Sequence, residues 1–299
     1  MVSTVGFAIG IDLGGTKIRG GLVAADGTVA VVDEHATDTS SATAIVDQIV
    51  AMARKLGEGR DLTGVGVGVP GTVEQPKGTL IQAVNLPLRN IALRDLLGSE
   101  LDAPVLVEND GNCAALGEHR FGAAAGTTHS VTLTLGTGVG GGIVADGRLL
   151  SGARGTGGEL GHIVIERNGR PCQGSCPGRG HLEAYCSGTA LGARGREAGF
   201  GDAHDVLARA ARGEEQALAL IDELSAALGA GLVSLANALA PDVFVIGGGL
   251  GDAGADLILP RAARILRTQS LPPNGEARLV AASLGNDAGM IGAACLVLP

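Results

Sequence analysis

The chain is organised around the stretch Ile9-Gly10-Ile11-Asp12-Leu13-Gly14-Gly15-Thr16-Lys17-Ile18-Arg19-Gly20-Gly21-Leu22-Val23. An Asp26-Gly27 pair and a second apolar run, residues 29–32, follow it. Apolar runs separated by Gly-Gly and Asp-Gly pairs predict a strand, a glycine turn, a strand, a hairpin turn and a third strand.

A similar stretch begins near residue 130 and reads Val131-Thr132-Leu133-Thr134-Leu135-Gly136-Thr137-Gly138-Val139-Gly140-Gly141-Gly142-Ile143-Val144, again followed by Asp146-Gly147. Leu13 corresponds to Leu135 and Gly27 to Gly147, at offsets of 122 and 120 residues. This weak internal repeat indicates two duplicated domains that face one another.

Strand-like and helix-like segments alternate over the rest of the chain, which predicts an α/β architecture. We expect a small α/β domain over residues 1–115, completed by a C-terminal helix at 287–299, and a large α/β domain over 116–286 that contains a metal loop at 159–183. Residues 72–90 read as loop. The run of residues 243–246 reads as a buried strand that opens onto glycines 247–249, with a helix at 255–267.

Composition narrows the class of protein. The net charge of -9 disfavours nucleic acid and anionic membranes as partners. Mean hydropathy is +0.30, yet no charge-free apolar run reaches 18 residues, and residues 1–11 lack the basic start of a signal peptide. We therefore expect a cytoplasmic protein. Five cysteines, an odd number, argue against a disulfide framework, and Cys113, Cys186 and Cys295 read as core residues.

The two glycine turns suit phosphate binding, because they present backbone N–H groups without side chains in the way. In the first turn, Asp12 could hold Mg²⁺ or its water. A plain tight hairpin is the alternative for either turn alone. A dinucleotide fingerprint is disfavoured because residues 136–140 continue into a strand and not a helix, and a P-loop is absent. Lys17 could reach phosphate, but it also fits the outward side of a strand, as does Arg19.

Asp110 follows a short apolar run, residues 105–107, beside Asn109. An acid at the carboxyl end of a strand can project into a cleft and accept a proton from an alcohol during phosphoryl transfer. Simple turn chemistry over Asn109-Asp110-Gly111 is the alternative.

The loop from Glu159 to Glu183 has an acid at each end and contains two histidines and two cysteines between them. Thiolates and imidazoles are the ligands that Zn²⁺ prefers, so His162, Cys172, Cys176 and His181 form a candidate Cys₂His₂ zinc site with a structural role. Two ordinary buried thiols in a glycine-rich loop, or Cys186 as a fourth ligand, are the alternatives. His35, His119, His129 and His204 have no partner motif.

Several motifs together resemble the ROK family of bacterial sugar kinases, especially its glucokinases. They are Asp12-Leu13-Gly14-Gly15-Thr16, Glu108-Asn109-Asp110-Gly111-Asn112, Leu135-Gly136-Thr137-Gly138, Glu159-Leu160-Gly161-His162 and the cysteine-containing loop. The resemblance covers nearly the whole chain. It implies the actin-like ATPase (ribonuclease H-like) fold, duplicated as two α/β domains around a central cleft.

The resemblance also implies roles for single residues. Asp110 would be the catalytic base for a sugar 6-hydroxyl. Sugar hydroxyls would be held by Gly71, Asn85, Asn109, Asp110, Glu159, His162 and Glu183. ATP phosphates would lie at Asp12, Gly14, Gly15, Thr16, Lys17, Gly136, Thr137 and Gly138, and adenosine near Gly247, Gly248 and Gly249. The cofactors would be ATP, Mg²⁺ and structural Zn²⁺, and the family's habit is a homodimer or a dimer of dimers.

One loop departs from the family pattern Cys-x-Cys-Gly-x-x-Gly-Cys-x-Glu. Here His181 stands in place of the last cysteine, and three residues separate Cys172 from Cys176 where the pattern has one. The expected activity is that of an ATP-dependent hexokinase, a glucokinase in the first place. N-acetylglucosamine, mannose or another hexose as substrate, polyphosphate as donor, and a non-catalytic sugar-binding regulator are the alternatives that the sequence leaves open.

Overall fold

The computed structural model describes residues 6–83, 85–174 and 176–299. Its first half is built on a five-stranded sheet in the order β3-β2-β1-β4-β8. The antiparallel strands are β1 (Phe7–Leu13), β2 (Lys17–Ala24) and β3 (Val29–Ala36), while β4 (Leu62–Val69) and β8 (Val105–Asn109) run parallel to β1. The predicted order of strand, glycine turn, strand, hairpin turn and strand is confirmed.

The second half repeats this arrangement in a sheet of order β11-β10-β9-β12-β13. Here β9 (Ser130–Leu135), β10 (Val139–Ala145) and β11 (Arg148–Leu149) are antiparallel, and β12 (Val243–Gly247) and β13 (Arg278–Ala281) run parallel to β9. The internal repeat found in the sequence is therefore a repeat of sheet topology.

Helices cover both faces of the first sheet. Helix α1 (Ala42–Gly57), which is N-capped by Ser41, packs with α2 (Leu93–Glu100) against the face that presents Ile9, Ile11 and Leu13. The opposite face of β1 receives α9 (Ala288–Cys295). At Gly66 of β4, a Cβ atom would lie 1.7 Å from the carbonyl oxygen of Ala293, so the close approach of α9 requires glycine there.

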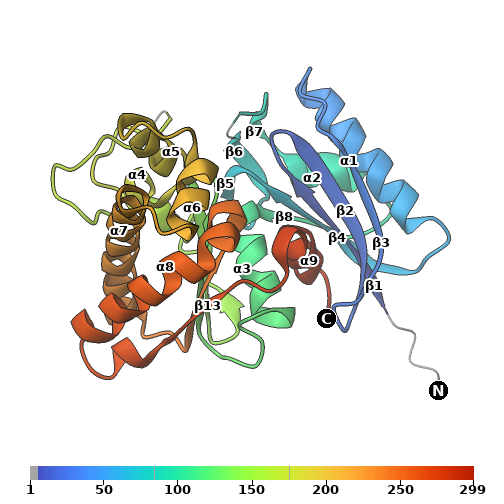
Figure 1. Cartoon of the computed structure of the whole chain (residues 1–299). Coiled ribbons are helices and arrows are strands. Elements are labelled where there is room, and N and C mark those ends of the chain that lie inside the picture. Colours follow the sequence, from blue (N-terminus) through green and yellow to red (C-terminus); the bar gives the residue numbers. More distant parts are fainter. Residues whose placement is uncertain (1–5, 84, 175) are drawn as a thin grey trace.

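Helix α3 (Asp110–Phe121) runs between the two sheets, with α9 beside it (Figure 1). It packs closely against β10. A Cβ atom added at Gly142 of β10 would lie only 2.7 Å from the Cβ of Ala115. Helix α9, the C-terminal helix, packs on the first sheet, as its contact with Gly66 shows. The division of the chain at residues 115 and 116 stays our proposal, since α3 contacts both halves.

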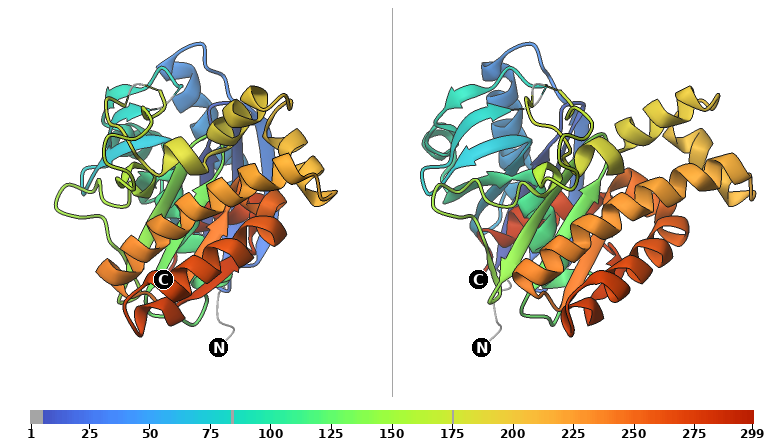
Figure 2. Two further views of the ribbon diagram at one scale, coloured as in Figure 1. Left: turned by 60° about the vertical axis from the view of Figure 1, so that its left-hand side comes forward. Right: turned by 90° about the vertical axis from the view of Figure 1, so that its left-hand side faces the viewer.

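The far face of the second sheet is covered by helices that lie side by side in Figure 2, α7 (Glu215–Leu239) and α8 (Gly248–Gln269). Shorter helices extend this layer: α4 (Glu183–Cys186), α5 (Gly188–Glu197) and α6 (Ala203–Ala211). By length and composition, α7 could cross a membrane, but its residues from Ala217 to Ala236 supply one face to the core of the second half, as a core helix does.

Three predictions about local structure were incomplete or wrong. Residues 72–90 are not loop throughout, because β5 (Gly71–Glu74), β6 (Thr79–Ala83) and β7 (Arg89–Ile91) form a separate three-stranded sheet. Helix α8 begins directly at Gly248 and not at residue 255, and no helix was expected where α3 lies. Each error lies where glycine or small polar residues hide the apolar period.

Candidate active site

Asp12 lies near the end of β1, just before the first glycine turn, and its side chain is largely buried. Because side chains alternate along a strand, Leu13 and Ile11 enter the core with α1, whereas Asp12 faces α9, where a Cβ at Gly289 would lie 2.6 Å from its Oδ2. The turn itself is closed by a hydrogen bond from the Gly14 N–H to the Lys17 carbonyl, 2.8 Å. Burial raises the pKa of Asp12 to about 6, against the opposing charge of Arg19.

Asp110 is the first residue of α3, directly after β8. Asn109 caps the helix, since its Oδ1 accepts the Asn112 N–H at 3.1 Å. Oδ1 of Asp110 accepts the N–H of Gly111 at 2.8 Å and the Asn109 amide at 3.1 Å. Removal from water raises the pKa of Asp110 to about 7, and the nearby charges of Asp12 and Glu159 act in the same direction. Residues 109–111 therefore form the N-terminus of a helix and not a simple turn.

A cavity of about 240 Å³ brings the two halves of the repeat together at this point. It is lined by Asp12 from β1 and Asp110 from α3, by Thr134 and Gly247 from the second sheet, and by Gly248 at the start of α8. Thr132 and Thr134 alternate with Leu133 and Leu135, which are buried among α7 and α8. Because side chains alternate along a strand, the polar residues of both sheets face the same cleft.

The second glycine turn, residues 136–138, borders a larger cavity of about 590 Å³. This turn is closed by a hydrogen bond from the Gly136 N–H to the Gly138 carbonyl, 2.9 Å. Gly249 lines the larger cavity and Gly247 the smaller one, so the glycine triplet lies at the border of the two. The rest of the larger cavity is lined from α5, α6 and α8, by Gly188, Thr189, Gly192, Arg196, Asp202, Ala203, His204, Leu207 and Leu250.

The residues expected to hold sugar differ in their burial and in their contacts. The Asn109 amide donates to the Gly71 carbonyl at 3.0 Å, so these two are in contact beside Asp110. Asn85 is exposed at φ 61° and lies near Gly15. Glu159 has its pKa raised by burial, a shift that His162 opposes and Glu183 reinforces.

Glu183 is already engaged by the protein. Its Oε2 accepts the Val139 N–H at 2.9 Å, directly after the second glycine turn, and its Oε1 lies 3.7 Å from the Cys172 Sγ. Its carboxylate therefore links the cysteine-containing loop to the turn. The sugar-binding role given to it by resemblance stays a prediction.

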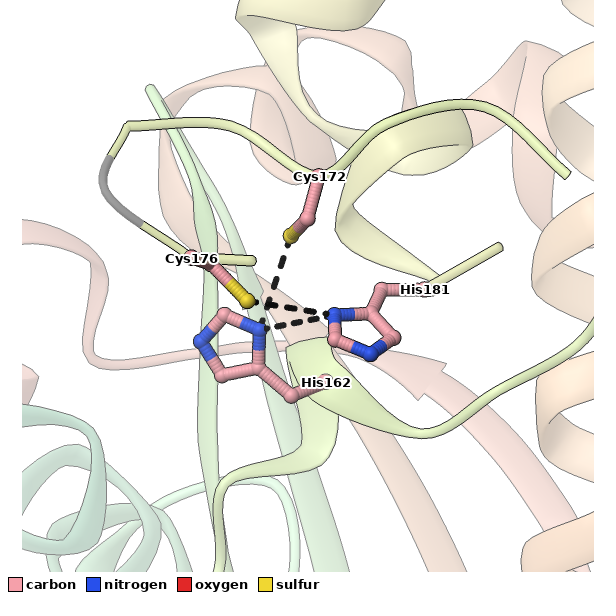
Figure 3. Close-up of side chains that lie close together, drawn as sticks. All are labelled: His162, Cys172, Cys176 and His181. Carbon is pink, nitrogen blue, oxygen red and sulfur yellow. Dashed lines mark hydrogen bonds between the residues drawn. The ribbon is translucent and has the colours of Figure 1, made fainter. Parts of the chain in front are cut away.

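The four predicted metal ligands converge, as Figure 3 shows. Their ligand atoms all lie within 4.8 Å of one another. The two Nδ1 atoms of His162 and His181 are 3.3 Å apart, and Cys172 and Cys176 each place Sγ 3.6 Å from one of them. Zinc bonds of about 2.3 Å to sulfur and about 2.05 Å to nitrogen at tetrahedral angles need separations of about 3.3 Å and 3.6 Å.

The donor set and these three separations thus fit tetrahedral zinc. Nε2 of His162 points away from the cluster in Figure 3. Cys186 lies outside the cluster, since its buried thiol donates to the Leu224 carbonyl at 3.6 Å. It is therefore not the fourth ligand in this structure.

Comparisons with known proteins agree with this geometry over the whole chain. The profile of the ROK family matches residues 8–299. The chain belongs to the ROK family. The glucokinase of Halalkalibacterium halodurans is 37% identical to it, with 97% of this chain and 94% of that protein covered.

Two solved ROK structures are similar in sequence and fold. The ROK glucokinase of Streptomyces griseus, determined with glucose and AMPPNP, is 34% identical with a TM-score of 0.82, covering 97% of this chain and 99% of that one. The ROK hexokinase of Thermus thermophilus is 33% identical with a TM-score of 0.85, covering 98% and 97%. The predicted fold class, two α/β domains of the actin-like ATPase type, is confirmed.

The structure places some of the expected residues of this candidate site differently and adds others. Lys17 points to Glu34 (Nζ to Oε1, 2.8 Å) with 66% of its side chain exposed, so the outward-strand interpretation describes it better than phosphate binding. His204 was set aside, yet it lines the larger cavity beside Asp202, which caps α6. An Asp before a helical run does signal a helix start, but not which cavity that helix borders.

Glu108 lies in the motif around Asp110, but no role was expected for it. It is 4% exposed and accepts the Asn109 N–H at 2.8 Å and the Asn112 amide at 3.0 Å. Burial raises its pKa, and these hydrogen bonds oppose the rise. Glu108 therefore fixes the segment that presents Asp110.

Proposed function

We propose that this protein is an ATP-dependent hexose kinase, in the first place a glucokinase that phosphorylates the 6-hydroxyl. The observation that carries the proposal is the position of Asp110, a carboxylate with a pKa raised to about 7 at the meeting point of both glycine-turn sheets. The glucose and AMPPNP bound by the Streptomyces griseus relative support both substrates.

Asp110 would act as the general base. Among the described residues, Oδ1 holds the Gly111 N–H and the Asn109 amide, whereas Oδ2 accepts no hydrogen bond. Oδ2 is thus the oxygen for a substrate hydroxyl. A base whose pKa lies near the working pH combines a useful fraction of carboxylate with enough basicity to accept the proton as the oxygen attacks the γ-phosphorus.

The remaining groups would position the reactants. The backbone N–H groups of the two glycine turns would hold phosphate oxygens, and the 590 Å³ cavity would take the adenosine. Asp12 would hold Mg²⁺, which supplies charge neutralisation on the β- and γ-phosphates when bound. Asn109 and Glu159, with Nε2 of His162, would bind sugar hydroxyls.

Zinc would have a structural role. With Nδ1 of His162 on the metal, the ring orientation would be fixed and Nε2 would stay available for a sugar hydroxyl. Because no water needs activation in this reaction, the metal contributes binding energy to folding of the loop.

One assay tests the proposal. The purified protein is given ATP or polyphosphate with glucose, mannose, N-acetylglucosamine and other hexoses, and sugar-dependent ADP release or sugar phosphate is measured. We expect glucose and ATP to give the highest kcat/KM. Faster turnover of another hexose would replace the substrate, and binding of sugar without any transfer would support a non-catalytic regulator, against which the intact Asp110 site argues.

A further inference from the structure

The second glycine turn is held in place by one segment of the chain, residues 183–189. The Gly188 N–H donates to the Gly136 carbonyl at 2.7 Å, and the Thr189 hydroxyl donates to the Thr137 carbonyl at 2.8 Å. On the other side of the turn, the Val139 N–H is bound by Glu183. The position of the turn therefore depends on how this segment is held.

Gln173 holds the segment from the metal loop. Its amide nitrogen Nε2 donates to the Glu183 carbonyl at 3.1 Å and to the Ser187 hydroxyl oxygen. Ser187 is fully buried and caps α5, because its Oγ accepts the Ala190 N–H at 3.0 Å. One side chain thus fixes both the start of α4 and the start of α5.

Gln173 lies between Cys172 and Cys176, in the part of the loop that is longer than the family pattern. It directly follows a candidate zinc ligand. The metal cluster, Gln173, Ser187 and the glycine turn therefore form a continuous series of bonded contacts.

We infer that Gln173 is a positioning residue that couples the metal loop to the turn at residues 136–138. This inference rests on the proposed function, in which that turn binds the phosphoryl donor. Loss of the Gln173 amide should release the segment 183–189 and weaken nucleotide binding. Sugar binding should change little, because Asn109 is held by Gly71 and Asn112. Gln173 contacts the carbonyl of Glu183 and not the carboxylate that is expected to bind sugar.

The test compares Gln173→Met with wild type. Methionine keeps the length of the side chain and removes the donor. We expect the KM for ATP and the Kd for ADP to rise about three- to tenfold, as the loss of one or two hydrogen bonds predicts. The KM for sugar should stay within about twofold, and the zinc content should equal that of wild type. Gln216→Met is the matched control, since Gln216 also donates to a backbone carbonyl, that of Ala198 at 3.3 Å, but on the surface.

Every outcome decides between the alternatives. Unchanged nucleotide affinity, or an equal rise in both KM values, overturns the inference. Loss of zinc together with weaker sugar binding also overturns it, because Gln173 would then only support the fold of the metal loop. If wild type phosphorylates no sugar, the proposed function fails, and the Kd for ADP of the two variants still tests the coupling.

Discussion

Asp110→Asn should stop phosphoryl transfer and also stabilise the protein at alkaline pH. The substitution removes the base. It keeps an amide oxygen that can accept the Gly111 N–H and the Asn109 amide, so the local hydrogen bonds survive. It also removes a charge that burial and the charges of Asp12 and Glu159 oppose.

The size of the stability effect follows from the pKa. The ordinary pKa of this carboxyl is 3.8, and in the folded protein its pKa is about 7. A raised acid pKa means that the folded state binds the proton more tightly, so ionisation destabilises it as pH rises from about 4 to about 7. The penalty is at most about 4 kcal/mol at pH 8 and about 2 kcal/mol at pH 5. Water in the cleft screens part of this penalty, so we expect about half of the stated value at each pH.

The assay is thermal unfolding of both proteins without ligands at pH 5, 6, 7 and 8. The advantage of the variant should grow with pH and reach roughly 5 °C in Tm at pH 8. Asp26→Asn is the control, because Asp26 is exposed and hydrogen bonds from Thr28 lower its pKa, so this variant should gain no stability with pH. In steady-state kinetics, Asp110→Asn should lose about 10²-fold or more in kcat and keep its affinity for sugar.

Two results would refute the reasoning about Asp110. A Tm difference that stays constant from pH 5 to pH 8 would show that the carboxyl is not held at a raised pKa. Normal turnover by the variant would remove Asp110 from the role of base.

Three further predictions concern the metal, the nucleotide and pH. Cys176→Ser should lower zinc content and Tm together, whereas Cys186→Ser should keep its zinc; metal analysis that finds the reverse would move the fourth ligand to Cys186. Thr137→Val should raise the KM for ATP more than that for sugar, and the opposite order in steady-state kinetics would reassign the second glycine turn. The value of kcat/KM should fall about tenfold per pH unit below about 7, because Asp110 must be ionised; a flat profile down to pH 5 would contradict this.

Most of the candidate site could be predicted because its signals are local. Both glycine turns follow strands whose alternation is visible in the sequence, and the four candidate zinc ligands lie within twenty residues of each other. The residues that were missed have no such signal. Glu108 and Gln173 act through contacts with segments whose proximity no periodicity reveals.

The sequence by itself determined the duplicated pattern, the two glycine turns and the identity of the acid after β8. Alternation with a period of two and turn-forming Gly pairs are properties of short segments, so they need no knowledge of distant contacts. Only the tertiary structure decided that Asp12, Asp110 and Gly248 line one cavity, that Lys17 points away to Glu34, and that Glu183 binds Val139. The physical reason is that these contacts depend on how two sheets and α3 pack, which is set by side-chain shape and burial over the whole chain.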